Sequence, residues 1–323
     1  MVGGERANQS GRAGADAARL ELTSVRAAKL AEAWERLVAP SPVLVCGPRH
    51  MGRRHLVREI ELRWLRERGG VVARAHLGVA DSPGALLHEL ARSLGVAATS
   101  STDFLHGLRG LAAAVKRPLL LEVSGYEAIV DDAQRRTRFG DTFRDVAAQM
   151  AFRRFSGGVA LLLLGEGRGK HLAGRPDYYR REIHVVELDA FTAGEAGELT
   201  LVWGLDGAEF AKLWAPTGGV PGLLVPALAH ALRAGANVQQ LVQQAASPDS
   251  PFGPVFVDLS HELQRDPEAK ATWRSAVRFG VTPCKAEVAE KLFRLGLAVV
   301  QDQDGGGHSV LPRCPLFKLH IAA

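Results

Sequence analysis

The chain lacks any long run of apolar residues. No apolar stretch reaches the roughly eighteen residues that a membrane-spanning helix requires. The N-terminal stretch "MVGGERANQSGRAGADAARL" also contains no apolar segment that would serve as a signal peptide. We therefore expect neither a membrane span nor a secretion signal, and we predict a cytoplasmic protein.

Cysteine is scarce as well. The three cysteines, Cys46, Cys284 and Cys314, are far apart in the sequence and do not have the paired spacing of metal ligands. This pattern argues against a disulfide framework and against a zinc site. We expect the three thiols to be small core residues in a reducing compartment.

Lysine is rare among the basic residues, because 32 of the 40 are arginine. This bias makes the replacement of any one lysine by arginine less surprising. The net charge of +5 and the pI of about 9.3 are compatible with an acidic partner but do not identify one. With 323 residues, 46% of them hydrophobic, the chain has enough apolar content for two or three domains.

Short apolar runs alternate with helical patterns over the first 188 residues. The runs are "VLVCG", "VVARAHLG", "PLLLEVSG", "VALLLLGEG" and "HVVEL". Continuous Leu/Val runs of this kind are typical of a parallel sheet buried on both faces by helices. We predict an α/β three-layer core with five mainly parallel strands, in which "VLVCG" is central and "PLLLEV" and "VALLLLG" lie close to it.

The stretch "VLVCGPRHMGRRHLVREI", residues 43–60, has the outline of a phosphate-binding loop. Gly47 and Gly52 bracket four residues between an apolar strand and a helix, so that backbone N–H groups would surround a phosphate. However, Arg53 and Arg54 stand where such loops have a lysine and a hydroxyl residue that binds Mg²⁺. An ordinary Gly-containing turn is the alternative. The candidate phosphate-binding residues are Gly47, Pro48, Arg49, His50, Met51, Gly52, Arg53 and Arg54.

A second strand should supply the acidic residues of such a site. In phosphate-loop ATPases this strand ends in an acidic residue that orients Mg²⁺, usually followed by a glutamate that activates water. In "RPLLLEVSGYEAI" these two positions hold Glu122 and Val123. Glu122 is the candidate metal ligand, and no catalytic residue is assigned. Glu127 is the less favoured substitute, because it lies beyond the Gly-containing turn.

At this point the chain resembles the AAA+ and signal-transduction (STAND) ATPases of bacteria and archaea, especially origin-recognition-like ATPases with a C-terminal winged helix. The resemblance covers roughly residues 20–320 and rests on the order of the elements and on "GPRHMGRR", "RPLLLEVSGYE", "GVALLLLGEG", "VVELDAFTAGEAGEL" and "TGGVPGLL". It implies a P-loop NTPase-type core, a helical lid, and ATP or ADP as ligand.

The chain departs from this family at several positions. The strand that ends in a polar sensor residue in the family ends here in Gly165 and Glu166. The lid motif "TGG-x-P" is present, but the arginine often found near it is absent. "GRPDYYRREI" offers Arg175, Arg180 and Arg181 as arginines that would reach the nucleotide of a neighbouring subunit, with solvated surface charge as the alternative.

The pattern and the resemblance together divide the chain into four segments. Residues 1–18 are small and polar, and we predict a disordered tail. The remaining three predicted segments are the NTPase-like core with its leading helix at 19–188, the helical lid at 189–247 and the winged-helix-like domain at 248–323.

The last segment allows two interpretations. As a DNA reader, its helix "TPCKAEVAEKLFRLG" would place Lys285, Lys291 and Arg294 near phosphates. However, Glu287 and Glu290 mix the charge of this helix, and the wing "QDQDGGGH" carries two aspartates. Because this wing would repel a DNA backbone, we favour protein interaction.

We predict a degenerate AAA+/STAND-like regulator or scaffold that acts through protein–protein interaction. It would bind ATP or ADP weakly, depend little on Mg²⁺ and not hydrolyse nucleotide. Its partner would be another protein or a second copy of the chain, with only weak binding to DNA. The alternatives are an active ATP-dependent switch or DNA-bound initiator or loader, and a winged-helix transcription regulator.

Overall fold

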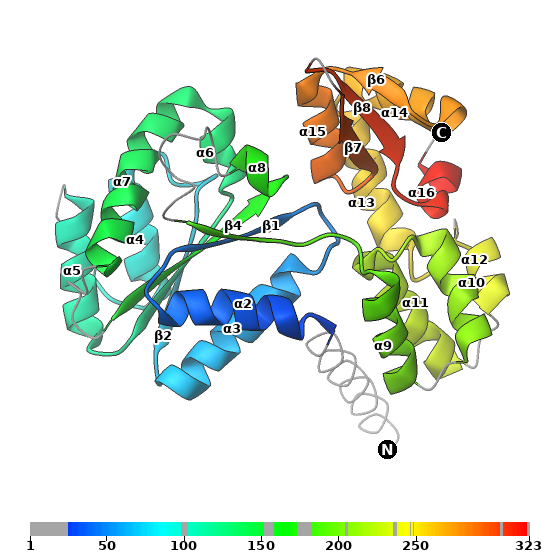
Figure 1. Ribbon diagram of the computed structural model, residues 1–323. Coiled ribbons are helices and arrows are strands. Elements are labelled where there is room, and N and C mark those ends of the chain that lie inside the picture. Colours follow the sequence, from blue (N-terminus) through cyan, green and yellow to red (C-terminus); the bar gives the residue numbers. More distant parts are fainter. Residues whose placement is uncertain are drawn as a thin grey trace, which may run out of the picture. The chain divides into compact units, whose positions relative to one another are not determined.

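The computed structural model (Figure 1) describes most of the chain after its N-terminal segment. The predicted tail at 1–18 lies outside the described residues, as do Arg175, Arg180 and Arg181. The described residues are 25–97, 103–151, 158–172, 183–203, 206–234, 238–245, 247, 249–303 and 306–321.

The chain divides into two compact units. The first, here called the sheet unit, comprises Ala28–Gly47 and Leu56–Leu188. The second, here called the C-terminal unit, comprises Met1–Ala27, Pro48–His55 and Asp189–Ala323. The candidate loop therefore belongs to the C-terminal unit, although the strand before it belongs to the sheet unit.

The sheet unit contains a five-stranded parallel sheet with the order β2-β3-β4-β1-β5. This confirms the predicted parallel sheet and its five strands. The central strand is β4 and not β1, which corrects the prediction for "VLVCG". The longest apolar run thus takes the middle position, where helices cover both faces. The strands are β1 (Val43–Gly47), β2 (Val71–His76), β3 (Leu119–Ser124), β4 (Val159–Glu166) and β5 (His184–Glu187).

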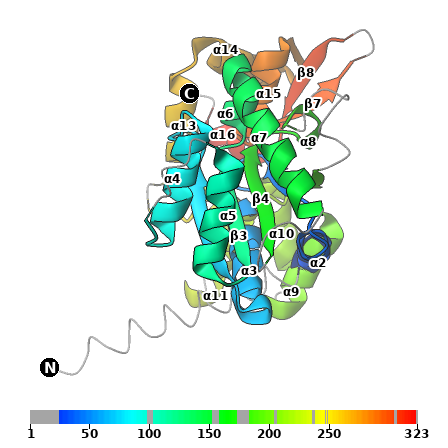
Figure 2. The same ribbon diagram turned by 90° about the vertical axis from the view of Figure 1, so that its left-hand side faces the viewer.

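Helices cover both faces of this sheet (Figures 1 and 2). Figure 2 shows α4, α5 and α7 in front of the strands, where they enclose a core that includes Leu121, Leu163 and Phe139. Figure 1 shows α2 and α3 on the other face, where Trp34 and Trp64 are buried. The helices of this part of the chain are α2 (Ala27–Val38), α3 (Arg53–Arg68), α4 (Pro83–Ser93), α5 (Phe104–Val115), α6 (Glu127–Asp131), α7 (Ala133–Ala151) and α8 (Gly169–Leu172).

Helices also dominate the C-terminal unit. Its core includes the fully buried rings of Trp273, Phe252 and Phe317. Asp206 and Asp266 cap two of the helices by accepting backbone N–H groups of the first turn. The helices after residue 189 are α9 (Ala193–Trp203), α10 (Gly207–Thr217), α11 (Pro221–Ala234), α12 (Val238–Gln243), α13 (Gly253–Gln264), α14 (Pro267–Phe279), α15 (Ala286–Arg294) and α16 (Pro315–His320).

A small antiparallel sheet completes this unit. The extended runs predicted around the Gly-rich turn are β7 (Ala298–Asp302) and β8 (His308–Pro312), which pair with each other. A third short strand, β6 (Thr282–Cys284), pairs with the other edge of β8 and had not been expected. The order of α13, α14, β6, α15, β7 and β8 is compatible with a winged helix, which stays a prediction. Among the helices that the structure describes, none is long and apolar enough to cross a membrane.

Candidate functional site

The loop after β1 has the predicted position between a strand and a helix. β1 ends at Gly47 and α3 begins at Arg53. Gly52 has a φ of +83°, a left-handed conformation that favours glycine, whereas a Cβ on Gly47 would collide with the carbonyl oxygen of Leu188. Gly47 is thus required by close packing within the sheet unit, and that requirement holds with or without a phosphate.

Backbone hydrogen bonds join the loop to the rest of the C-terminal unit. The Arg49 N–H donates to the carbonyl oxygen of Arg294, with an N···O distance of 2.8 Å. The Gly222 N–H donates to the carbonyl oxygen of His50 at 2.9 Å. Phosphate-binding loops use their backbone N–H groups on the ligand. Here one of those groups is already engaged with the end of α15.

Close packing reinforces these two bonds. A Cβ on Gly296 would lie 2.8 Å from the Arg49 carbonyl oxygen, and one on Gly222 would lie 2.7 Å from the Cβ of His50. The Met51 side chain is 1% exposed. The loop is therefore an integral part of the core of this unit, because its backbone approaches neighbours that only glycine accommodates.

A carboxylate lies next to the cationic side chains of the loop. Asp258, on α13, places Oδ2 3.7 Å from Nη1 of Arg49 and 3.6 Å from Nε2 of His50. An anionic ligand that approached this part of the loop would meet a negative charge and would compete with it for Arg49. The arrangement thus favours attachment of the loop to α13 over phosphate binding.

The "TGG-x-P" motif forms the turn between α10 and α11. The buried Thr217 hydroxyl donates to the Leu213 carbonyl oxygen at 2.7 Å. Gly218 ends α10 in a left-handed conformation, and Gly219 lies against the ring of Trp214. These roles are structural. Gly222 follows the motif directly, and its N–H joins the beginning of α11 to the loop.

Glu122 lies away from the loop end of the sheet. In the register of the parallel strands, Glu122 pairs with Leu162, and Leu162 pairs with Val43 at the beginning of β1. Gly47 instead pairs with Glu166. Four residues of strand, about 13 Å at 3.3 Å per residue, therefore separate the level of Glu122 from that of Gly47. This register does not bring Glu122 to the expected position of a magnesium ligand.

The side chain of Glu122 belongs instead to a charged cluster beside α3. Arg74 places Nε 3.1 Å from Oε2 of Glu122 and Nη2 2.6 Å from Oε1 of Glu61. Burial, together with the hydrogen bond to Glu61 and the charge of Glu61, raises the pKa of Glu122 to about 8. Burial also opposes ionisation of Glu61, but hydrogen bonds with Glu122, Arg58 and Arg74 outweigh it and lower the pKa of Glu61. The two carboxyl groups thus share one proton, which resides on Glu122.

Besides Glu166 and Glu187, which end β4 and β5, the Glu127 carboxylate reaches the carboxyl end of the sheet. Its Oε2 accepts the backbone N–H of Glu166 at 2.8 Å, and Glu166 pairs with Gly47. Gly125, with a φ of +78°, turns the chain so that α6 begins at this edge. Sequence reasoning ranked Glu127 below Glu122 because of this turn. The turn itself was the signal, since it redirects the chain along the edge.

No group of three or more His, Cys, Asp or Glu side chains that could hold a metal ion is found within the described ranges of the chain. In the C-terminal unit, the candidate site is the loop with its contacts to α11, α13 and α15; in the sheet unit, the candidate carboxylate is Glu127.

The comparisons with known proteins agree with this architecture. A family model described as an AAA-like domain matches residues 184–323. The match begins at β5 and thus does not include the loop. No curated protein matches the chain.

Two solved structures share the fold over most of the chain. The Walker-type ATPase PABY2304 of Pyrococcus abyssi is 14% identical, with 92% of this chain and 95% of that chain covered and a TM-score of 0.61. The ORC2 protein of Aeropyrum pernix, solved in ADPNP–ADP complexes, is also 14% identical, with coverages of 92% and 91% and a TM-score of 0.53. The chain is thus similar to an AAA-like domain over residues 184–323, and it shares with these two structures an α/β fold with a parallel five-stranded sheet.

The contact at Gly222 provides a test of the loop attachment. We expect Gly222→Ala to lower the free energy of unfolding by about 1–3 kcal/mol, because the new methyl group would overpack against His50. Hydrogen exchange of the Arg49 amide should accelerate. Urea unfolding and hydrogen-exchange mass spectrometry measure the two effects. The matched control is Gly207→Ala, where a Cβ meets nothing within 4 Å; equal effects of both variants would contradict the attachment.

The shared proton predicts a pH-dependent stability. Because folding raises the pKa of Glu122, the protonated side chain stabilises the folded state. This contribution to the free energy of unfolding is fully present below the ordinary pKa of 4.5 and is lost as the pH rises to about 8. Glu122→Gln keeps a hydrogen-bond donor to Glu61. Because the amide does not titrate, the variant does not lose stability as the pH rises. Its stability advantage over the natural chain should grow by on the order of 1–3 kcal/mol across that range. Urea unfolding at several pH values measures it, with the exposed Glu198→Gln as control; parallel curves for Glu122→Gln and the natural chain would refute the shared proton.

Proposed function

We propose that this protein is an AAA-like regulatory or scaffold protein whose nucleotide site has degenerated and whose output is protein–protein interaction. The observation that carries the proposal is the attachment of the loop to its own C-terminal unit. The Arg49 N–H and the His50 carbonyl group form hydrogen bonds within the same chain, and the side chains of both residues lie near Asp258. A phosphate would have to compete with these contacts.

Weak phosphate affinity follows from the groups that remain. Arg53 and Arg54 begin α3, and its first turn contains no acidic residue, so that the positive end of the helix dipole and two guanidinium groups coincide. This positive region would attract an anion. However, the Arg49 N–H is engaged, and a guanidinium differs from the lysine ammonium in shape and hydration. We infer that ATP or ADP binds weakly.

The proposed loss of hydrolysis rests on magnesium and on the attacking water. Arg54 has no oxygen to offer as a ligand, and its charge would repel the ion. Glu122 lies at the level of the other end of β1, and Val123 is a buried core residue. Glu122 would therefore not orient the ion or a water molecule for in-line attack, and Oε2 of Glu127 already accepts the Glu166 backbone N–H.

An active ATP-dependent switch is the second candidate, and Glu127 favours it. Its carboxylate lies at the same edge of the sheet as Gly47. If a nucleotide displaced the loop contacts, Glu127 would be the residue to orient Mg²⁺ or water. The two candidates therefore differ in whether Glu127 matters for turnover.

Nucleotide binding and phosphate release together decide between these two candidates. For the degenerate site we expect calorimetry to give weak or absent binding of ATP and ADP, little change with Mg²⁺ and no phosphate release above background. Asp258→Asn should strengthen nucleotide binding, because it removes the negative charge next to Arg49, whereas the exposed Asp249→Asn should leave it unchanged. Mg²⁺-dependent turnover that is abolished by Glu127→Gln would instead establish the active switch.

We also propose that residues 248–323 form a winged-helix-like domain, following residues 19–188 and 189–247 as core and lid. The basic residues considered for DNA contact all have acidic neighbours. Lys285 lies 2.8 Å from Glu268, Lys291 lies 2.7 Å from Asp266, and Arg294 lies 3.6 Å from Glu290. These pairs offset the charge that a DNA backbone would need, and they support a protein partner or a second copy of the chain.

Exposed apolar side chains in the same segment support protein interaction further. Phe279 and Val281 flank Gly280 between α14 and β6, and they are 69% and 52% exposed. Large apolar groups exposed side by side are common at protein-binding surfaces. This surface distinguishes the regulator from the third candidate, a winged-helix transcription factor, for which DNA binding would be the principal activity.

A salt titration of binding to duplex DNA distinguishes the protein-binding regulator from the transcription factor. We expect weak binding without sequence preference that falls steeply as salt rises, because only unspecific charge attraction would contribute. Fluorescence anisotropy with labelled duplexes of unrelated sequence measures it. Glu268→Gln, which frees Lys285, should strengthen this binding, whereas the exposed Glu198→Gln should not. Tight and sequence-selective binding at physiological salt would favour the transcription regulator or the initiator.

A further inference from the structure

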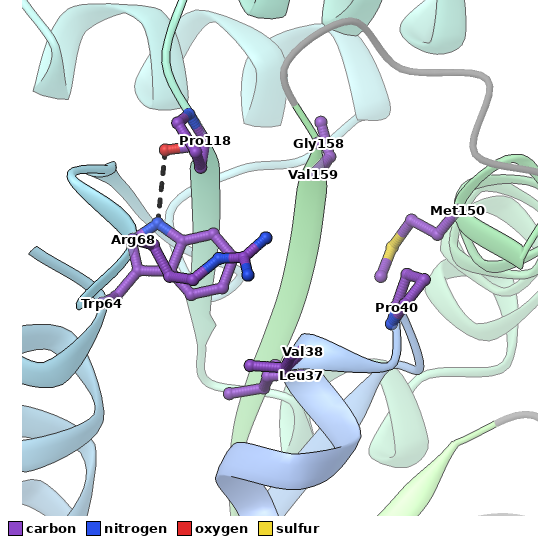
Figure 3. Close-up of a pocket in the computed structure, with 9 residues that line it drawn as sticks. All are labelled: Leu37, Val38, Pro40, Trp64, Arg68, Pro118, Met150, Gly158 and Val159. Carbon is purple, nitrogen blue, oxygen red and sulfur yellow. Dashed lines mark hydrogen bonds between the residues drawn. The ribbon is translucent and has the colours of Figure 1, made fainter.

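A cavity of about 460 Å³ opens in the sheet unit, and Figure 3 shows the residues that line it. Gly158 and Val159 mark it at the beginning of β4, and Pro118 precedes β3. The strands therefore place this cavity at their amino ends, whereas the loop follows the carboxyl end of β1. Leu37, Trp64 and Met150 are among its apolar lining residues, and Arg68 is its charged one.

The aromatic wall of the cavity is held in place before any ligand arrives. The Trp64 Nε1–H donates to the Pro118 carbonyl oxygen at 3.2 Å, as the dashed line in Figure 3 shows. The Trp64 ring also meets the Trp34 ring edge-on, with a centroid distance of 6.1 Å. With its polar hydrogen satisfied and its body buried, Trp64 offers a rigid apolar surface.

One cation accompanies these apolar walls. Arg68 is the last residue of α3, and its guanidinium lies 5.8 Å from the centroid of the Trp64 ring. The exposed Arg68 side chain has no carboxylate partner among the residues that the structure describes. A second positive charge lies close to the end of α3, because the Arg117 guanidinium binds the carbonyl oxygens of Gly69 and Gly70 at 2.7 and 2.9 Å.

We propose that this cavity binds a small, flat, apolar molecule that carries one carboxylate. Its apolar body would pack against Trp64, Met150 and the aliphatic lining, and its carboxylate would meet the planar fork of Arg68. The volume lies within the usual range for small-molecule sites, roughly 300–1,000 Å³. A mostly apolar lining with a few polar or charged groups is also typical of such sites.

The charges of the site favour a monocarboxylate over the other ligand classes. A cation would be repelled by Arg68 and Arg117. A nucleoside triphosphate would need several hydrogen-bond donors for its phosphates, whereas the lining contributes a single guanidinium. An uncharged apolar molecule would fill the cavity but would leave the charge of Arg68 unused. A monocarboxylate with an apolar body satisfies both features.

Three probes of matching shape test the proposal on the full chain: 2-naphthoate, the neutral 2-naphthamide and the cationic 2-naphthylmethylamine. Calorimetry should show saturable binding of the carboxylate, roughly tenfold or more weaker binding of the amide, and none of the amine, because a charge-assisted hydrogen bond to arginine is lost. Equal binding of carboxylate and amide, or the absence of carboxylate binding, would overturn the proposal.

Two arginine variants locate the effect. Arg68→Gln should weaken binding of 2-naphthoate roughly tenfold or more and should leave the amide unaffected, since a charge-assisted hydrogen bond is replaced by a neutral contact. Arg66→Gln is the matched control, because Arg66 is an exposed arginine on the same helix that bonds the Leu62 carbonyl oxygen and does not line the cavity. Both side chains are exposed, so that folding should survive. Equal losses in both variants would reduce the effect to general surface charge and contradict the site.

Discussion

The constraint on which the function of this chain depends is the attachment of its glycine-bracketed loop to its C-terminal unit. A phosphate-binding loop works because its backbone N–H groups point at a ligand and find no better partner in the protein. Here the Arg49 amide has found one in the carbonyl group of Arg294. Since an engaged N–H group must lose its partner before it binds phosphate, this contact is the basis of the weak nucleotide binding that we propose.

In the C-terminal unit, carboxylates also lie close to cations that could otherwise bind phosphate. The chain is strongly basic in sum, but Asp258 lies beside the loop cations and Asp266 and Glu268 lie beside the lysines of α15. A net charge describes the field at a distance, whereas recognition of phosphate depends on cations without close carboxylates. A pI of about 9.3 is thus compatible with the weak binding to nucleic acid that we propose.

Much of the fold was predictable because its signals are local. Continuous Leu/Val runs predicted the five parallel strands, and Gly52, which has a left-handed conformation, lies in the loop expected between a strand and a helix. The order of the strands was less accessible. Placing β4 in the centre depends on how the whole sheet assembles, and no short segment carries that information.

The candidate site shows the limit of the sequence more sharply. The residue types at Arg53 and Arg54 alone determined that this loop lacks the lysine and the hydroxyl of a working phosphate site, because side-chain chemistry is independent of context. Only the tertiary structure decided that Glu127, and not Glu122, reaches the loop end of the sheet, since strand register is set by pairing between distant segments. It also decided the partner of the Arg49 amide, a residue more than two hundred positions away in the chain that folding alone brings within hydrogen-bond distance.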